Sequence, residues 1–295
     1  MKLLLSVLAT AFLLSLSRAC IFSSGKFDNL RVTWMLNPFG DGAFEALPRN
    51  LNDDDHDGFV LRDDFCANQG PFKGLRYWKD NDPTVALLYD ANGYIAGLQT
   101  MIPKDKYPID ASQINNPYVD DGDYWTLTVY FVPTGKSSGV LLTPQTYKIC
   151  TGRTSEEYEE QGTGTSLYLQ NSDDPANVES IALDQDTFDA EIGQQEGGWE
   201  KMKCFPAMGR HYWYGLSKEM DCSTFRPFFL LFARGELRGF GFNILKKFET
   251  SNRYETVPPS AAKLFFNVVP DCMKDIGDTL SLHVYLHNKP QLNLC

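Results

Sequence analysis

Short segments in which apolar and polar residues alternate constrain the fold more than any other feature of the sequence. Alternate side chains share one face of a strand, whereas a helix repeats about every 3.6 residues. From Thr279 to His287, one face carries only leucine and valine: Leu280, Leu282, Val284 and Leu286. The same alternation recurs from Tyr124 to Val132. The pattern predicts strands that each bury one face.

Other segments extend this prediction to an all-β fold. Thr84 to Tyr89 and Tyr94 to Ile102 flank Asp90-Ala91-Asn92-Gly93, which is typical of a hairpin in which Gly93 has a positive φ. Phe228 to Phe232 is continuously apolar, as in a strand buried on both faces. We also expect a helical turn at Ala43 to Leu47, and strands at Leu30 to Leu36, Val140 to Leu142, Tyr147 to Cys150, Leu237 to Leu245 and Ala262 to Val269. The predicted architecture is a β-sandwich or irregular barrel with short helical segments.

The first 19 residues have the features of a secretory signal peptide. Lys2 precedes an apolar run from Leu3 to Leu16, and Ser17-Arg18-Ala19 is a small-x-small cleavage site. The alternative is a membrane anchor, but a run of about 14 residues is shorter than the roughly 20 that a spanning helix needs. We therefore expect a secreted, extracellular protein without a membrane span that begins at Cys20.

Cysteine content and charge narrow the classes of partner. Seven cysteines in a secreted chain predict disulfides, and the odd one would be free, modified or in an intermolecular disulfide. A bridge between Cys20 and Cys295 would tie down both chain ends. The net charge of −11 opposes binding to nucleic acid and anionic membranes. It favours cations or basic partners. Dense aromatic residues around His211 would also suit stacking on a sugar, so the expected partners are calcium and an extracellular protein or carbohydrate.

Composition also suggests a division of the chain. We assign residues 20–79 to an N-terminal segment and residues 80–295 to a β-rich domain. Within that domain, residues 151–203 are acidic and poor in apolar side chains, which predicts a long surface excursion.

The most specific motif is an acidic stretch near the N-terminus. In the twelve residues from Asp53 to Asp64, acidic side chains occupy the first, third, fifth and twelfth positions, and Gly58 occupies the sixth. This spacing resembles the calcium loop of the EF-hand family. The resemblance implies a Ca²⁺ site made by the side chains of Asp53, Asp55, Asp57 and Asp64 and the carbonyl of Phe59.

Three departures from the EF-hand pattern favour a structural role for this loop. The twelfth position is Asp64 rather than the longer glutamate, and Pro48 and Gly70-Pro71 leave little room for flanking helices. The sequence also contains no second loop of this kind. We predict a solitary calcium loop in a β protein, and the alternative is a solvated acidic turn.

Histidines and one serine motif give weaker signals. On a strand, His283 and His287 would lie roughly 13 Å apart, so they could not bind one metal ion, and we expect them to face solvent or a ligand. Gly135-Lys136-Ser137-Ser138-Gly139 matches a nucleophile elbow, but no helix follows, so a polar turn explains it. His211 lies in an aromatic segment between Cys204 and Cys222 that would form a ligand pocket or fill the edge of the core.

These features predict a secreted calcium-binding β protein that acts by binding or as a structural component of matrix or body fluid. The alternative is a secreted enzyme, a hydrolase or metal-dependent oxidoreductase, with its site near His211. The sequence contains no complete catalytic constellation, which favours the first hypothesis.

Overall fold

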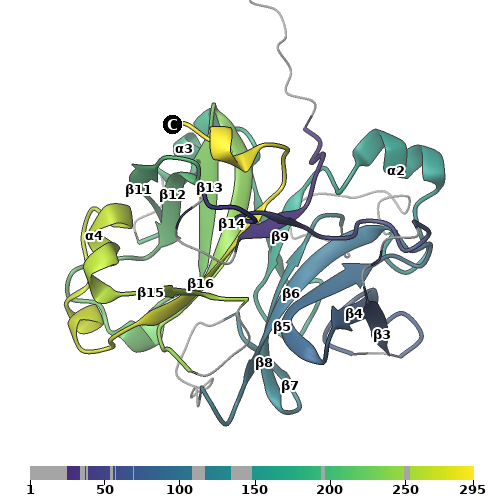
Figure 1. Ribbon diagram of the computed structural model, residues 1–295, viewed down its shortest axis with the longest axis horizontal. Coiled ribbons are helices and arrows are strands. Elements are labelled where there is room, and N and C mark those ends of the chain that lie inside the picture. Colours follow the sequence, from purple (N-terminus) through teal and green to yellow (C-terminus); the bar gives the residue numbers. More distant parts are fainter. Residues whose placement is uncertain are drawn as a thin grey trace, which may run out of the picture.

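The computed structural model describes residues 25–33, 37, 39–53, 56, 58–68, 70–107, 117–133, 148–193, 197–248 and 253–295. These residues form two antiparallel sheets, each with eight strands (Figure 1). The all-β prediction is therefore confirmed.

Sheet I contains most of the C-terminal third of the chain. Its strand order is β11-β12-β13-β14-β16-β1-β2, and β15 also pairs with β16. The strands are β1 (Arg31–Thr33), β2 (Glu45–Ala46), β11 (Trp199–Phe205), β12 (Gly209–Tyr214), β13 (Phe228–Ala233), β14 (Glu236–Ile244), β15 (Glu255–Val257) and β16 (Thr279–Tyr285).

Sheet II is built mainly from the first half of the chain. Its order is β10-β9-β8-β6-β5-β4-β3, and β7 pairs with β8. The strands are β3 (Phe59–Asp64), β4 (Leu75–Lys79), β5 (Asp82–Tyr89), β6 (Ile95–Pro103), β7 (Val119–Asp121), β8 (Tyr124–Tyr130), β9 (Leu167–Gln170) and β10 (Val178–Ile181). The predicted hairpin is β5–β6, and Gly93 in its turn has a φ of 86°.

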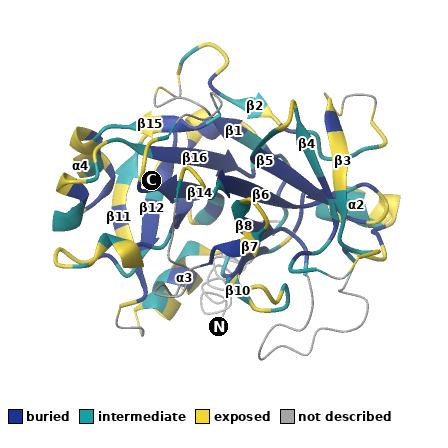
Figure 2. Ribbon diagram, turned by 90° about the horizontal axis from the view of Figure 1, so that it is seen from below, coloured by how far each residue is buried: buried dark blue, intermediate teal, exposed yellow. Residues whose placement is uncertain are grey.

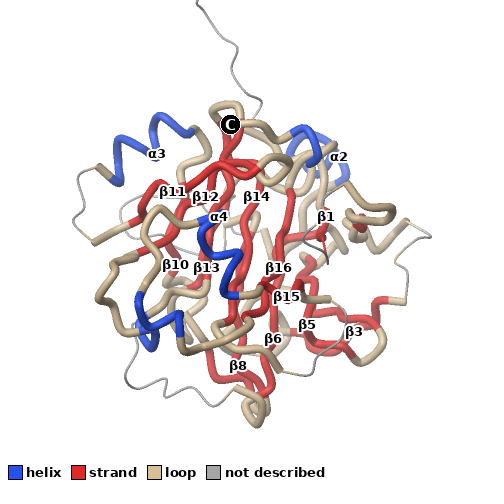
Figure 3. Tube along the Cα trace, turned by 60° about the vertical axis from the view of Figure 1, so that its left-hand side comes forward, coloured by secondary structure: helices blue, strands red, loops and turns tan. Residues whose placement is uncertain are grey.

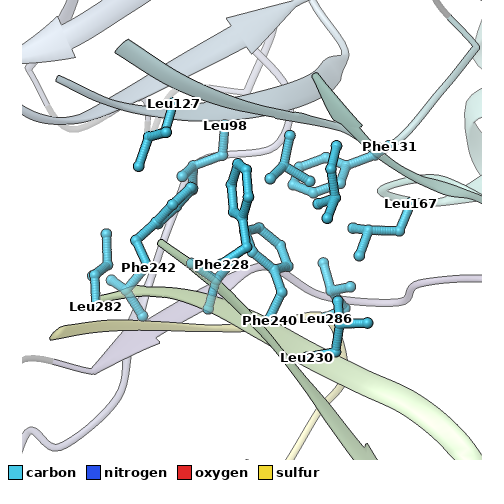
Figure 4. Packing of buried hydrophobic residues seen from close by; sticks show 14 of the residues in the cluster. Leu98, Leu127, Phe131, Leu167, Phe228, Leu230, Phe240, Phe242, Leu282 and Leu286 are labelled. Carbon is cyan, nitrogen blue, oxygen red and sulfur yellow. The ribbon is translucent and has the colours of Figure 1, made fainter. Parts of the chain in front are cut away.

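The main core lies between the sheets, as in a β-sandwich. Sheet II and the residue after β8 contribute Leu98, Leu127, Leu167 and Phe131, which meet side chains of sheet I (Figure 4). The labelled partners from sheet I and the residues just beyond it are Phe228, Leu230, Phe240, Phe242, Leu282 and Leu286. The leucine and valine face expected for Thr279 to His287 is therefore the inner face of β16.

Helices are short and lie at the periphery, where much of their surface is exposed (Figure 2). The α-helices are α2 (Ser155–Gln161), α3 (Gln185–Ile192) and α4 (Ala262–Phe265). The 3₁₀ turns are η2 (Cys222–Thr224), η3 (Pro259–Ala261), η4 (Asp271–Lys274) and η5 (Pro290–Leu292). None of the helices in the described ranges has the length and apolar character needed to cross a membrane.

Three disulfides confirm the expectation from cysteine content. They join Cys66 to Cys150, Cys204 to Cys295, and Cys222 to Cys272. A Cys20–Cys295 bridge is therefore wrong, because Cys204 already occupies Cys295; Cys20 lies outside the described residues.

Three local predictions are wrong; strand pairing explains the first and a proline the second. Residues Ala43 to Leu47 contain strand β2 rather than a helical turn, because Glu45 and Ala46 pair with β1. Ala262 to Val269 begins with helix α4 rather than a strand, and Pro259 at the first position of η3 starts the helical stretch. The strand predicted at Tyr147 to Cys150 is also wrong, because residues 148–150 lie in a turn where Cys150 forms its disulfide with Cys66. Tyr147 and the strand predicted at Val140 to Leu142 lie outside the described residues.

The acidic stretch 151–203 is more than a surface excursion. It supplies β9 and β10 to sheet II and β11 to sheet I, and it includes α2 and α3. Leu167, Phe188 and Trp199 from this stretch lie in the main core. The predicted division at residue 80 stays a prediction. Strands from before and after residue 80 join the same two sheets.

Candidate binding pocket beneath helix α4

A cavity of about 300 Å³ lies on the outer face of sheet I, on the side away from the main core. Helix α4 crosses in front of these strands (Figure 3), and residues from α4, η3 and η4 line the cavity together with the sheet. Most of its wall is apolar or aromatic, including Trp213, Phe229, Phe265, Phe266 and Met273. We call this cavity, including the β12, β13 and β16 residues at its floor, the α4 pocket.

His211 lies on the floor of the α4 pocket, so the structure places it in a pocket and not merely at the core edge. Alternation along β12 directs Tyr212 into the main core and His211 and Trp213 to the outer face. The His211 imidazole is fully buried and stacks on Trp213, with ring centroids 5.3 Å apart. Burial, reinforced by nearby His283, lowers the pKa of His211 to about 3. The ring is therefore neutral at physiological pH.

His283 also faces the pocket, and a buried carboxylate stands beside it. Strand β15 pairs with β16, which places Glu255 Oε2 3.3 Å from His283 Nδ1. Both side chains are buried. The two groups are within ion-pair distance, so a buried carboxylate stands directly beside a ring that faces the pocket.

Gly241 on β14 makes this arrangement of rings sterically feasible. It pairs with Phe229 on one side and with His283 on the other. A Cβ at Gly241 would lie 2.0 Å from Phe229 Cζ, so only glycine leaves room for the Phe229 ring to extend over β14. The Phe229 and His283 rings then meet with centroids 4.8 Å apart.

Buried polar atoms without a hydrogen-bond partner gather at this face of sheet I. Within the described residues they include both ring nitrogens of His211, Trp213 Nε1, both carboxylate oxygens of Glu255, His283 Nδ1 and Tyr285 Oη, so the close approach of Glu255 to His283 does not have hydrogen-bond geometry. Each such buried atom costs about 1–3 kcal/mol when it is left unpaired. A ligand that paired with those facing the cavity would recover part of this free energy, so the floor has unused binding capacity.

The structure separates two of the predicted calcium ligands. Gly58 has a φ of 76°, as a tight turn requires, and the Phe59 N–H donates to the His56 carbonyl at 2.9 Å. Phe59 and Asp64 are the two ends of β3, so about 16 Å of extended chain lies between them. Asp64 Oδ1 instead accepts the backbone N–H groups of Cys66 and Ala67, each at 2.9 Å.

The other predicted ligands leave the calcium site a prediction. Asp53 is exposed, and its Oδ1 accepts a hydrogen bond from Asn50 Nδ2 at 2.9 Å. Asp55 and Asp57 lie outside the described residues, and so does Gly135 to Gly139. Over the ranges that the structure covers, no three or more His, Cys, Asp or Glu side chains are placed to hold a metal ion.

His287 lies outside the α4 pocket. Its Nε2 lies 3.2 Å from the Leu237 carbonyl oxygen, and its ring packs edge-on against Phe27. His287 lines a separate cavity with Lys26 and Glu236. His283 and His287 line different cavities, as expected for two side chains that are too far apart to bind one metal ion together.

Sequence reasoning identified His211 and His283 separately but missed Glu255 and their common pocket. The contact between Glu255 and His283 depends on the pairing of the three-residue strand β15, for which the sequence around residue 255 carries no clear pattern.

Comparison with known proteins does not identify a function for this pocket: no protein-family model, curated protein or solved structure matches the chain.

Proposed function

We propose that this protein is an extracellular binding protein that holds a small, largely apolar molecule in the α4 pocket. The observation that carries the proposal is an apolar cavity whose floor contains buried polar atoms without partners. Ligand sites in proteins commonly combine apolar walls with a few convergent polar groups. The disulfides support an oxidising, extracellular setting, as does the leader-like N-terminus.

We further propose that Ca²⁺ at Asp53, Asp55 and Asp57 is a structural accessory to this function. The support comes from the spacing of the carboxylates and from the positive φ of Gly58. In this proposal, the calcium loop steadies the turn before β3 and has no direct part in ligand binding.

General-base catalysis is a second candidate function, favoured by the Glu255–His283 pair. A carboxylate within ion-pair distance of an imidazole in an apolar pocket resembles the arrangement that enzymes use for proton transfer. This function would use the same pocket, so turnover of a bound molecule, and not binding itself, separates the two candidates.

The test uses N-phenyl-1-naphthylamine, whose fluorescence rises in an apolar site. Ala262 lines the α4 pocket and Leu264 on the same helix is exposed, so Ala262→Phe should block the pocket whereas Leu264→Phe should not. We expect a saturable fluorescence rise with the natural chain and with Leu264→Phe, and at least a tenfold weaker affinity with Ala262→Phe. Equal affinity in all three folded proteins would overturn the proposal.

A further inference from the structure

The size of the α4 pocket limits what it can hold. A dry cavity of about 150 Å³ in another protein accommodates benzene. The cavity of about 300 Å³ here therefore has room for a ligand about twice that size. That volume encloses a fused bicyclic ring with one small substituent, so the phenyl group of the larger probe N-phenyl-1-naphthylamine would project past the exposed lysines at the rim, and a long acyl chain would not fit.

The walls favour a flat aromatic molecule over a branched aliphatic one. Trp213 lies 4.9 Å from Phe229 and 4.6 Å from Phe266, measured between ring centroids. His211 lies 5.1 Å from Phe265 by the same measure. Aromatic rings attract one another in offset-stacked and edge-to-face arrangements at these separations. An aromatic ligand would extend this network of rings into the cavity.

The floor selects the polar group of the ligand. Neither ring nitrogen of His211 makes a hydrogen bond of good geometry, although backbone groups of Lys203 and Gly209 lie near the ring, and Trp213 Nε1 adds an unpaired donor. A hydroxyl group donates one hydrogen bond and can accept two, so it complements one acceptor and two donors.

An anionic group fits the floor poorly. The Glu255 carboxylate lies behind His283 and would repel a ligand anion, and His211 carries no compensating charge. The lysines that line the cavity, Lys263 and Lys274, are exposed at its rim, and Lys274 is paired with Asp271. A ligand carboxylate could reach Lys263 or Lys274 only if the ligand bound in the opposite orientation, with its polar group at the rim.

We infer that the α4 pocket binds a neutral bicyclic aromatic molecule that bears one hydroxyl group, with the hydroxyl directed to His211 and Trp213. This inference rests on the proposed function, because it names the ligand class of the same pocket. It differs from that proposal in requiring a specific hydrogen bond and not apolar burial alone.

The experiment compares three naphthalene probes as competitors of N-phenyl-1-naphthylamine. 2-Naphthol carries the hydroxyl, 2-methylnaphthalene has nearly the same shape without it, and 2-naphthoate carries a charge. We expect 2-naphthol to compete at a concentration at least tenfold below that of either other probe. His211→Phe and Trp213→Phe keep the aromatic walls and should each reduce this preference several-fold, whereas His287→Phe, outside the pocket, should leave it unchanged.

The outcomes separate the ligand class from the pocket itself. Equal competition by 2-naphthol and 2-methylnaphthalene would show that the pocket does not recognise the hydroxyl group. That result would overturn the inference while leaving the pocket as a binding site. Stronger competition by 2-naphthoate would show an anion held at the lysine rim and would also overturn the inference. If N-phenyl-1-naphthylamine itself does not bind in an Ala262-dependent way, the proposed function fails first.

Discussion

The Asp90 carboxylate and the Arg153 guanidinium form an ion pair at 2.8 Å that is closed to solvent, with side-chain exposures of 0% and 1%. The remaining hydrogen-bonding capacity of both groups is also used. Arg153 donates to the carbonyl oxygens of Gly162 and Ile95, and Asp90 accepts the N–H groups of Asn92 and Tyr94. The pair thus fastens the β5–β6 turn to the chain that leads into α2.

Replacement of Asp90 should therefore destabilise the fold strongly. Asp90→Asn keeps an acceptor for the turn but leaves the buried Arg153 charge without a counterion, which costs about 3–5 kcal/mol. Urea unfolding measures the loss. The control is Asp120→Asn, which breaks the exposed Lys104–Asp120 pair at 2.6 Å and should cost less than about 1 kcal/mol. Similar losses in both variants would contradict the importance of burial.

The Asp90–Arg153 pair also illustrates what sequence reasoning could and could not predict. The turn from Asp90 to Gly93 was predictable, because its residue types dictate local backbone geometry. The partner Arg153 was not, because it lies 63 residues away in a stretch whose composition suggested only surface. The same limit applies to the site. His211 and His283 stood out locally, whereas the role of Glu255 follows from strand pairing alone.

The buried His211 makes stability depend on pH. Its pKa is lowered to about 3 in the folded protein, mainly by burial, against about 6.5 when unfolded. Between these values the unfolded chain binds the extra proton, so the His211 contribution is complete above pH 6.5 and is lost as the pH falls. From pH 7 to pH 5 we expect His211 to account for a loss of about 2 kcal/mol.

Urea unfolding at pH 7 and pH 5 measures this dependence, with His211→Phe as the comparison. The variant should lose about 2 kcal/mol less than the natural chain over this interval. Burial also lowers the pKa of His287, but that contribution is present in both proteins and cancels. An unchanged pH dependence in His211→Phe would show that His211 is not the responsible group.

The Cys222–Cys272 disulfide should control how long the α4 pocket retains a ligand. Cys272 lies in η4, and its neighbours Met273 and Lys274 line the pocket. Replacing both cysteines with serine releases this wall from η2, so N-phenyl-1-naphthylamine should dissociate several-fold faster in stopped-flow measurements. The control replaces Cys66 and Cys150, which lie on the sheet II side.

The two disulfide variants should differ in binding and not in stability. Loop closure predicts a loss of about 4 kcal/mol for each bridge, because the sequence separations of 50 and 84 residues differ little on a logarithmic scale. Faster dissociation in both variants would indicate a general loosening of the fold and would contradict a specific role for η4.

Calcium should raise the melting temperature if the acidic loop binds it. Extracellular calcium sites have dissociation constants of about 10⁻⁴–10⁻³ M, so 10 mM Ca²⁺ would stabilise the fold by about 1–3 kcal/mol. Substituting Asp53 and Asp57 with alanine should abolish the rise measured by differential scanning calorimetry. Substituting Glu159 and Glu160 on α2, which removes the same charge elsewhere, should preserve it.

Asp64→Ala separates a true EF-hand closure from a smaller site. In an EF-hand loop the twelfth residue closes the coordination sphere, so its loss would remove the calcium effect. Here β3 carries Asp64 away from Phe59, and its side chain holds the turn at Cys66 and Ala67. We therefore expect Asp64→Ala to lower the melting temperature equally with and without Ca²⁺, leaving the calcium-dependent rise intact. Loss of that rise in Asp64→Ala would mean that β3 must rearrange when calcium binds.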